Sequence, residues 1–355
     1  MKKLIVCLSL VTVFLSCKES KPTVAEPLKP VLIDLTALEG DGNKVVPKYI
    51  NSITNEELKE MLYFYASDEM EGRDTGEPGQ KRATNYLREK YKAMGIASGS
   101  GDESYYQIVP DTFFRRNSGL KSSENVLAFI KGSEKPEELL VLSAHLDHVG
   151  VDADGNVYNG ADDDGSGTVA LLEIADAFQQ AVKEGNGPKR SILFLHVTGE
   201  EKGLYGSKFY TQYPVYPLAN TIANLNIDMI GRVDDAHLED PNYVYLIGSD
   251  KLSTDLHNIS AAINEKYSKI NLDYRYNVEN EPNRFYYRSD HYNFAKNNVP
   301  VIFYFNGVHA DYHRITDTPD KINYEMLEKR TQLIFATAWE LLNRKDRPVV
   351  DGKTR

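Results

Sequence analysis

The stretch from Ser143 to Gly167 constrains the fold of this chain more than any other part of the sequence. An apolar run at residues 138–144 has the length and composition of a buried β-strand. A His-x-Asp pair, His145 and Asp147, follows directly, where a parallel sheet would present its carboxyl edge to a ligand. Three consecutive aspartates, 162–164, come next, and they would repel one another unless a cation or strong donors neutralised them. The stretch therefore predicts half of a metal site at a sheet edge.

The rest of the chain alternates apolar, strand-like runs with helical patterns. This alternation favours a mostly parallel sheet covered by helices on both faces. The 355 residues, 41% of them apolar, are enough for one large domain with a sizeable core. The predicted fold class is α/β, a three-layer α/β/α sandwich around a mostly parallel, mixed sheet. We expect strands at residues 125–130, 139–144, 191–197, 222–230, 243–247 and 299–305, and helices at 54–65, 79–94, 165–181, 205–213, 255–270, 290–297 and 324–343.

The N-terminal residues have the pattern of an export signal. Lys2 and Lys3 precede an apolar run that is too short to span a membrane. The end of this run resembles the lipobox of bacterial lipoproteins, in which Cys17 becomes the lipid-carrying first residue. Plain secretion and a retained signal anchor are the alternatives. We expect a signal peptide at 1–16, a lipidated cysteine and flexible tether at 17–45, a single folded domain at 46–345 and a polar tail at 346–355.

The net charge limits which binding partners are expected, and the cysteine content limits which disulfides are possible. The formal net charge of −11 disfavours contact with phosphate backbones, so we expect no nucleic-acid partner. The two cysteines, Cys7 and Cys17, both lie in the N-terminal segment, so the mature domain would contain no disulfide. The only expected membrane contact is the lipid on Cys17, which would hold a monomer outside the bacterial cytoplasm, facing the periplasm or cell surface.

Other strand ends also carry residue types that bind metals. Glu200 and Glu201 follow one apolar run, Asp228 closes another, and the loop after the last run contains His309 and His313. Each is ordinary alone, because a strand-end histidine is commonly a surface residue and paired glutamates commonly form a solvated face. Their joint placement at strand ends predicts one metal site.

In order and spacing, these motifs resemble metallopeptidase family twenty-eight, the co-catalytic di-zinc exopeptidases that include bacterial leucyl aminopeptidases and glutamate carboxypeptidases. The likeness covers residues 54–344. It implies a zinc-exopeptidase (phosphorylase/hydrolase-like) fold with two Zn²⁺ ions. It also implies a ligand set in which Asp162 bridges the two ions: His145, Asp162 and Asp228 for one ion, and Asp162, Glu201 and His313 for the other.

The resemblance also suggests roles for residues beside the ligands. Glu200 would be the general base, and Asp147 would orient the imidazole of His145 from outside the ligand set. Tyr286, three residues before a Ser-Asp-His motif, would donate to the oxyanion, although Tyr287 remains an alternative. The roles of His148 and His309 stay undecided. Asp163 and Asp164 are expected to cap the helix that follows them.

The implied activity is hydrolysis of N-terminal residues from peptide substrates, by a hydroxide that bridges the metal ions. One alternative is a glutaminyl cyclase, a transferase on the same fold that uses one zinc ion. Another is a glutamate carboxypeptidase-like dipeptidase, and a third is an inactive substrate-binding lipoprotein. The intact aspartate run and both glutamates favour hydrolysis.

Overall fold

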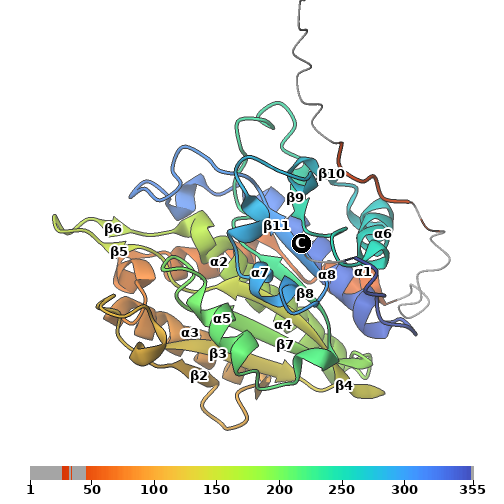
Figure 1. The fold of residues 1–355 in the computed structure, drawn as a ribbon, viewed down its shortest axis with the longest axis horizontal. Coiled ribbons are helices and arrows are strands. Elements are labelled where there is room, and N and C mark those ends of the chain that lie inside the picture. The colour runs from red at the N-terminus through yellow and green to blue at the C-terminus, as the bar shows by residue number, and fades with distance from the viewer. Residues whose placement is uncertain (1–25, 32, 34–44, 353–355) are drawn as a thin grey trace, which may run out of the picture.

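A computed structural model describes residues 26–31, 33 and 45–352, and Figure 1 shows their arrangement. The expected signal peptide and Cys17, with most of the expected tether, lie outside the described residues. Among the helices of the described part, none has both the length and the apolar character needed to cross a membrane.

A mixed sheet forms the centre of the fold, with nine strands in the described residues. Its order is β1-β3-β7-β4-β8-β11-β9-β10, and β2 pairs with β3. The strands are β1 (Ala97–Ser98), β2 (Tyr106–Val109), β3 (Ser123–Ile130), β4 (Lys135–His145), β7 (Arg190–Val197), β8 (Thr221–Ile227), β9 (Tyr243–Ile247), β10 (Asn271–Asp273) and β11 (Val301–Phe305). A separate antiparallel pair consists of β5 (Gly150–Val151) and β6 (Val157–Tyr158).

The middle strands β7, β4, β8 and β11 run parallel, whereas β3 and β9 flank them antiparallel. Side chains of β4 alternate between two cores: Leu140 and Leu142 join one, and Leu139 and Val141 join the other. Because both faces of a parallel strand are covered, its sequence is a continuous apolar run. This explains why the middle strands could be predicted from the sequence.

Helices cover both faces of the sheet (Figure 1). One face packs against α4 and α8 together with α1, α2, α3 and α6, and the other packs against α5 and α7. The helices are α1 (Val46–Ile50), α2 (Asn55–Tyr65), α3 (Pro78–Met94), α4 (Gly167–Lys183), α5 (Tyr205–Gln212), α6 (Thr254–Ile263), α7 (His291–Ala295) and α8 (Tyr324–Asn343). The predicted α/β class and layered architecture are therefore confirmed.

The prediction misses helix α1 and several short strands, and it gives one helix as longer than its α-helical part. The helix expected at 255–270 ends at Ile263 in α6, and a single π-helical turn follows it. Asn264 then exchanges side-chain hydrogen bonds with the backbone N–H and C=O of Ile270, which supports the turn that leads into β10. The two-residue strands β1, β5 and β6 and the edge strands β2 and β10 are too short or too polar for a periodic signal.

Candidate metal centre

Five side chains meet near the carboxyl ends of the parallel strands. β4 ends at His145, Asp228 follows β8, and Glu201 follows β7 after a short turn. Asp163 comes from the turn before α4, and His313 comes from the loop after β11. Neighbouring parallel strands end at the same edge, so residues far apart in the sequence converge there.

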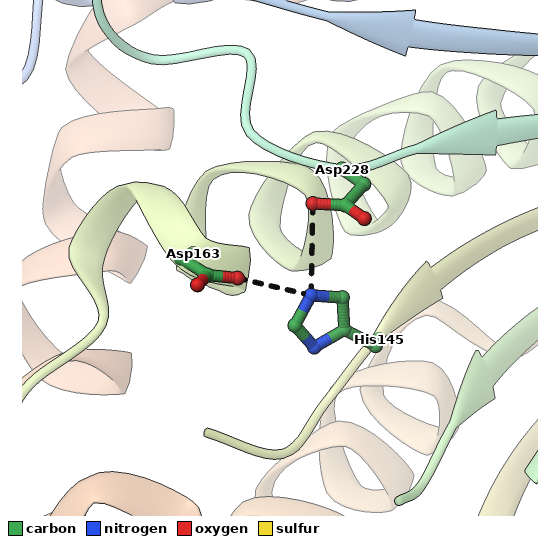
Figure 2. A group of neighbouring side chains, drawn as sticks. All are labelled: His145, Asp163 and Asp228. Carbon is green, nitrogen blue, oxygen red and sulfur yellow. Dashed lines mark ion pairs between the residues drawn. The ribbon is translucent and has the colours of Figure 1, made fainter. Parts of the chain in front are cut away.

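The first cluster consists of His145, Asp163 and Asp228, and all three side chains are buried (Figure 2). His145 Nε2 lies 3.1 Å from Asp163 Oδ1 and 3.6 Å from Asp228 Oδ1. Figure 2 shows both carboxylates turned toward the same ring nitrogen. One nitrogen facing two carboxylate oxygens is a donor set suited to zinc.

A second cluster shares Asp163 with the first. His313 Nε2 lies 3.0 Å from Asp163 Oδ2 and 3.1 Å from Glu201 Oε2. The other oxygen of Glu201, Oε1, lies 2.9 Å from Nδ1 of the buried His148. Asp163 therefore presents one oxygen to each cluster, which is the arrangement of a bridging carboxylate.

The structure corrects the expectation for Asp162, which does not lie between the two clusters. Asp162 Oδ1 accepts hydrogen bonds from the Gly231 backbone N–H at 2.7 Å and from Ser166 Oγ at 3.0 Å. Asp162 Oδ2 lies 3.1 Å from His309 Nε2. The adjacent Asp163 takes the central position instead. Consecutive side chains of this turn point in different directions. An assignment that is one residue too early therefore selects a side chain in a different environment.

Asp163 was expected to cap a helix, and that role belongs to Asp164 alone. Asp164 Oδ1 accepts from the backbone N–H of Gly167, the first residue of α4, at 2.9 Å, and from that of Met229 at 3.1 Å. Its Oδ2 accepts from the His145 backbone N–H at 3.0 Å. Asp164 thus joins the end of β4, the start of α4 and the segment after β8.

The charges of the cluster call for a cation. Burial alone would lower the pKa of His145, but Asp163 and Asp228 outweigh it and raise that pKa well above its usual value. Burial also opposes ionisation of Asp163, yet His145 and His313 lower its pKa well below the usual range. The pKa of His313 rises to about 10 because Asp163 and Glu201 outweigh the opposing burial. The carboxylates therefore favour a positive charge at both imidazoles, and a divalent cation would supply that charge, so the donor set fits such a cation.

Asp147 supports the site differently from expectation. His145 Nδ1 lies 3.0 Å from the backbone oxygen of Asp147 but 3.9 Å from its carboxylate. The carboxylate instead accepts from Thr75 Oγ1 at 2.8 Å and from the Glu200 backbone N–H at 3.1 Å. The imidazole is therefore oriented by a backbone carbonyl, while the Asp147 carboxylate fixes the position of Glu200. Burial raises the pKa of the Glu200 carboxyl well above its usual value.

A narrow pocket opens on the first cluster. Its wall includes Glu200 and a group of mostly apolar side chains: Met229, Phe285, Arg288, Phe303, Phe305, Val308 and Tyr312. Tyr286 is not in this wall, contrary to expectation. Its ring is buried in the core with α7, close to Gly248, because the short 3₁₀-helix Phe285–Tyr287 turns Phe285 toward the pocket instead.

Two residues of the site escaped the sequence reasoning. Tyr312 is the tyrosine of the pocket wall, and its ring stacks on His313 with centroids 4.0 Å apart. Tyr312 directly precedes the proposed ligand His313, and this position is the only feature of the sequence that could have indicated its role. Ser289 Oγ donates to Asp228 Oδ2 at 2.5 Å and accepts from Asn226 Nδ2 at 2.9 Å, which fixes the orientation of that carboxylate. Its position in the Ser-Asp-His motif could have indicated this role.

Comparison with known proteins gives consistent matches. The model of Peptidase family M28 matches residues 125–338. Leupeptin-inactivating enzyme 1 of Streptomyces exfoliatus is 29% identical over 238 residues, which cover 67% of this chain and 44% of that protein. Probable glutamate carboxypeptidase AMP1 of Arabidopsis thaliana is 34% identical over 123 residues, which cover 34% of this chain and 16% of that protein. The chain spans less than half the length of the curated relatives it matches.

Among solved structures, BSAP, a zinc aminopeptidase from Bacillus subtilis, superposes with a TM-score of 0.63. The two chains are 15% identical, and the superposition covers 85% of this chain and 99% of that one. At this identity the likeness shows a shared fold.

Proposed function

Because this chain belongs to peptidase family M28, we propose that it is a zinc-dependent exopeptidase that removes N-terminal residues from peptides. The observation that carries the proposal is the position of Asp163. Its two carboxylate oxygens lie 3.1 Å from His145 Nε2 and 3.0 Å from His313 Nε2. A carboxylate shared in this way offsets the repulsion between two cations about 3.5–4 Å apart.

Under this proposal His145, Asp163 and Asp228 would hold one zinc ion, and Asp163, Glu201 and His313 would hold the other. Each ion would have one imidazole and two carboxylates, which leaves a coordination position for water or substrate, as catalytic zinc sites require. Zinc bound there would polarise the substrate carbonyl and lower the pKa of water. The inactive-lipoprotein alternative gives no reason for so many buried carboxylates around one point.

Glu200 is the proposed proton carrier. Its side chain lines the pocket beside His145 and Asp228, and its backbone is tied to Asp147. The Glu200 carboxylate would take a proton from the attacking water and deliver it to the nitrogen of the departing amine. Burial raises its pKa, which brings the carboxylate closer to the basicity that a general base needs near neutral pH.

The pocket wall favours an apolar side chain next to the scissile bond. Phe285, Phe303 and Phe305 form an aromatic surface, and Val308 and Met229 extend it. We therefore propose peptides with an apolar N-terminal residue as the substrate class.

Arg288 supports a second candidate, a carboxypeptidase. It is a cationic residue in the pocket wall, and its guanidinium lies 5.2 Å from the ring centroid of Phe285. A guanidinium there is suited to bind the terminal carboxylate of a dipeptide.

The test compares three peptides with the same apolar first residue and zinc supplied: a free peptide, an N-acetylated peptide and a C-terminally amidated peptide. An aminopeptidase releases the first residue from the free and amidated peptides and leaves the acetylated one intact. Cleavage that requires a free carboxylate would replace this proposal by the carboxypeptidase. Cyclisation of N-terminal glutamine without hydrolysis would replace it by the cyclase.

We also propose that the enzyme is a monomeric bacterial lipoprotein outside the cytoplasm, acting on peptides there. This proposal rests on the charged start and apolar run of the first residues and on the lipobox-like sequence at Cys17. Cys17→Ala should move the protein from the membrane fraction to the soluble fraction, and an unchanged membrane fraction would contradict the anchor.

A further inference from the structure

His148 is a fully buried histidine that neither cluster needs as a ligand. It follows His145 by three residues, just before β5. Its Nδ1 lies 2.9 Å from Glu201 Oε1 and 3.7 Å from Asp163 Oδ2. Among the described residues, neither ring nitrogen has a hydrogen bond of regular angle. A buried imidazole in that condition is costly, so packing alone does not explain the residue.

The surroundings leave the His148 ring little freedom to move. Gly160 lies against it so closely that a Cβ there would come within 2.5 Å of two ring atoms. On another side, His313 packs edge-on, with ring centroids 5.7 Å apart and planes at 72°. The ring is therefore held with Nδ1 toward the two carboxylates.

Glu201 lies between two imidazoles that approach different oxygens. His148 Nδ1 approaches Oε1, and His313 Nε2 approaches Oε2 at 3.1 Å. Because Oε1 faces the His148 ring at 2.9 Å, only Oε2 remains for a cation. If Glu201 binds the cation through one oxygen, the coordination position that its second oxygen would fill stays open for water or substrate.

We propose that His148 is a positioning residue of the metal centre, which holds Glu201 so that it binds a cation through a single oxygen. This inference rests on the proposed metal centre. The competing role is direct ligation, because ligand atoms of His148, Asp163 and Glu201 all lie within 4.8 Å of one another. Direct ligation would give the ion four protein ligands with His313, which is the closed set of a structural zinc site.

The test measures zinc binding to three variants of the full protein. His148→Phe keeps the ring and removes its nitrogens, and His148→Asn places an amide donor close to the Nδ1 position. His257→Phe is the matched control, since His257 is equally buried and pairs with Ser249 away from the centre. Chelator competition gives the stepwise zinc affinities, circular dichroism checks folding, and the Co²⁺-substituted forms give visible spectra.

We expect His148→Phe to weaken one of two zinc-binding steps by about 10–100-fold, the usual effect of removing a residue that supports a ligand. His148→Asn should recover most of that affinity, and His257→Phe should bind zinc normally. The Co²⁺ spectra should keep the band positions and intensity of the wild type.

Unchanged zinc affinity in folded His148→Phe would overturn the inference, and so would a Co²⁺ spectrum showing the loss of a nitrogen ligand. If His148→Phe does not fold, wild-type affinity in His148→Gly would overturn it, and weakened affinity that imidazole restores would support it. A wild-type protein that binds no zinc would overturn the proposed function itself, which distinguishes the two failures.

Discussion

Glu200 is placed to move protons, whereas the neighbouring Glu201 faces the two histidines of the second cluster. A Glu200→Gln variant keeps the shape of the side chain but cannot accept a proton. We expect its zinc content to equal that of the wild type and its kcat to fall by about 10³-fold, the scale on which general acid–base catalysis contributes. Steady-state kinetics combined with metal analysis of the same preparation measures both quantities.

The matched control is Glu173→Gln in α4. Glu173 is a buried glutamate whose pKa, like that of Glu200, is raised by burial, here to about 8, but it lies outside the pocket wall. Its variant should turn over substrate at the wild-type rate. Near-normal turnover in Glu200→Gln, or an equal loss in both variants, would show that Glu200 is not the base.

Asp162 and Asp163 are neighbours with different expected effects. Asp163→Asn removes the shared carboxylate, so we expect it to lose both zinc ions and all measurable activity. Asp162→Asn keeps one acceptor oxygen and replaces the other with an amide donor, so one buried contact loses its acceptor. We expect this variant to keep zinc and lose about 1–3 kcal/mol of unfolding free energy. Metal analysis and denaturant unfolding test both variants. Loss of zinc in Asp162→Asn with retention in Asp163→Asn would restore Asp162 as the bridge.

At the scale of elements, the loop after β11 depends on contacts with the turn before α4. Asp317 accepts from the backbone N–H groups of Asp162 at 3.0 Å and Asp163 at 3.2 Å. His309 approaches the Asp162 carboxylate from the same loop. These contacts bracket His313 in the sequence, so they fix where its imidazole meets Asp163. Asp162 and His309 thus support the site from outside the ligand set.

Helix α4 carries a pH dependence through Glu173. Burial, with Glu57 and Asp176 nearby, raises the pKa of Glu173 from 4.5 to about 8. The folded state therefore binds a proton that the unfolded state has released between these values, so this group makes stability fall as pH rises from about 4.5 to about 8. The unfolding free energy of Glu173→Gln should match that of the wild type near pH 4.5 and exceed it by up to about 5 kcal/mol at pH 8.5, since each unit of pKa shift corresponds to about 1.4 kcal/mol. Urea unfolding across this range measures the difference, and a constant difference would contradict the assignment.

At the scale of the molecule, the sequence predicted the six longer strands of the sheet but neither its short strands β1, β2 and β10 nor the arrangement of side chains at its carboxyl edge. Apolar runs such as 191–197 predict the central strands because both faces of those strands are buried. The choice among three identical aspartates could not be made, since it depends on how the turn after Gly160 directs each side chain. The expected place of Tyr286 at the pocket was wrong for the same reason. Spacing along a sequence does not tell which side of a one-turn helix faces the pocket.

The whole molecule should also respond to metal removal, because the centre joins turns and loops from four parallel strands. Ligands that bind only the folded state stabilise it by RT ln(1 + [L]/Kd), so free zinc at 100 times Kd would contribute about 2.7 kcal/mol. We expect chelation to lower the unfolding temperature and zinc to restore it. Without a cation the neighbouring carboxylates raise the pKa of His145 and His313, so zinc binding near pH 7 should also release protons. Titration calorimetry in buffers of different ionisation enthalpy measures the number of protons released for each zinc ion bound. Zinc binding without proton release would contradict the raised pKa of these two histidines.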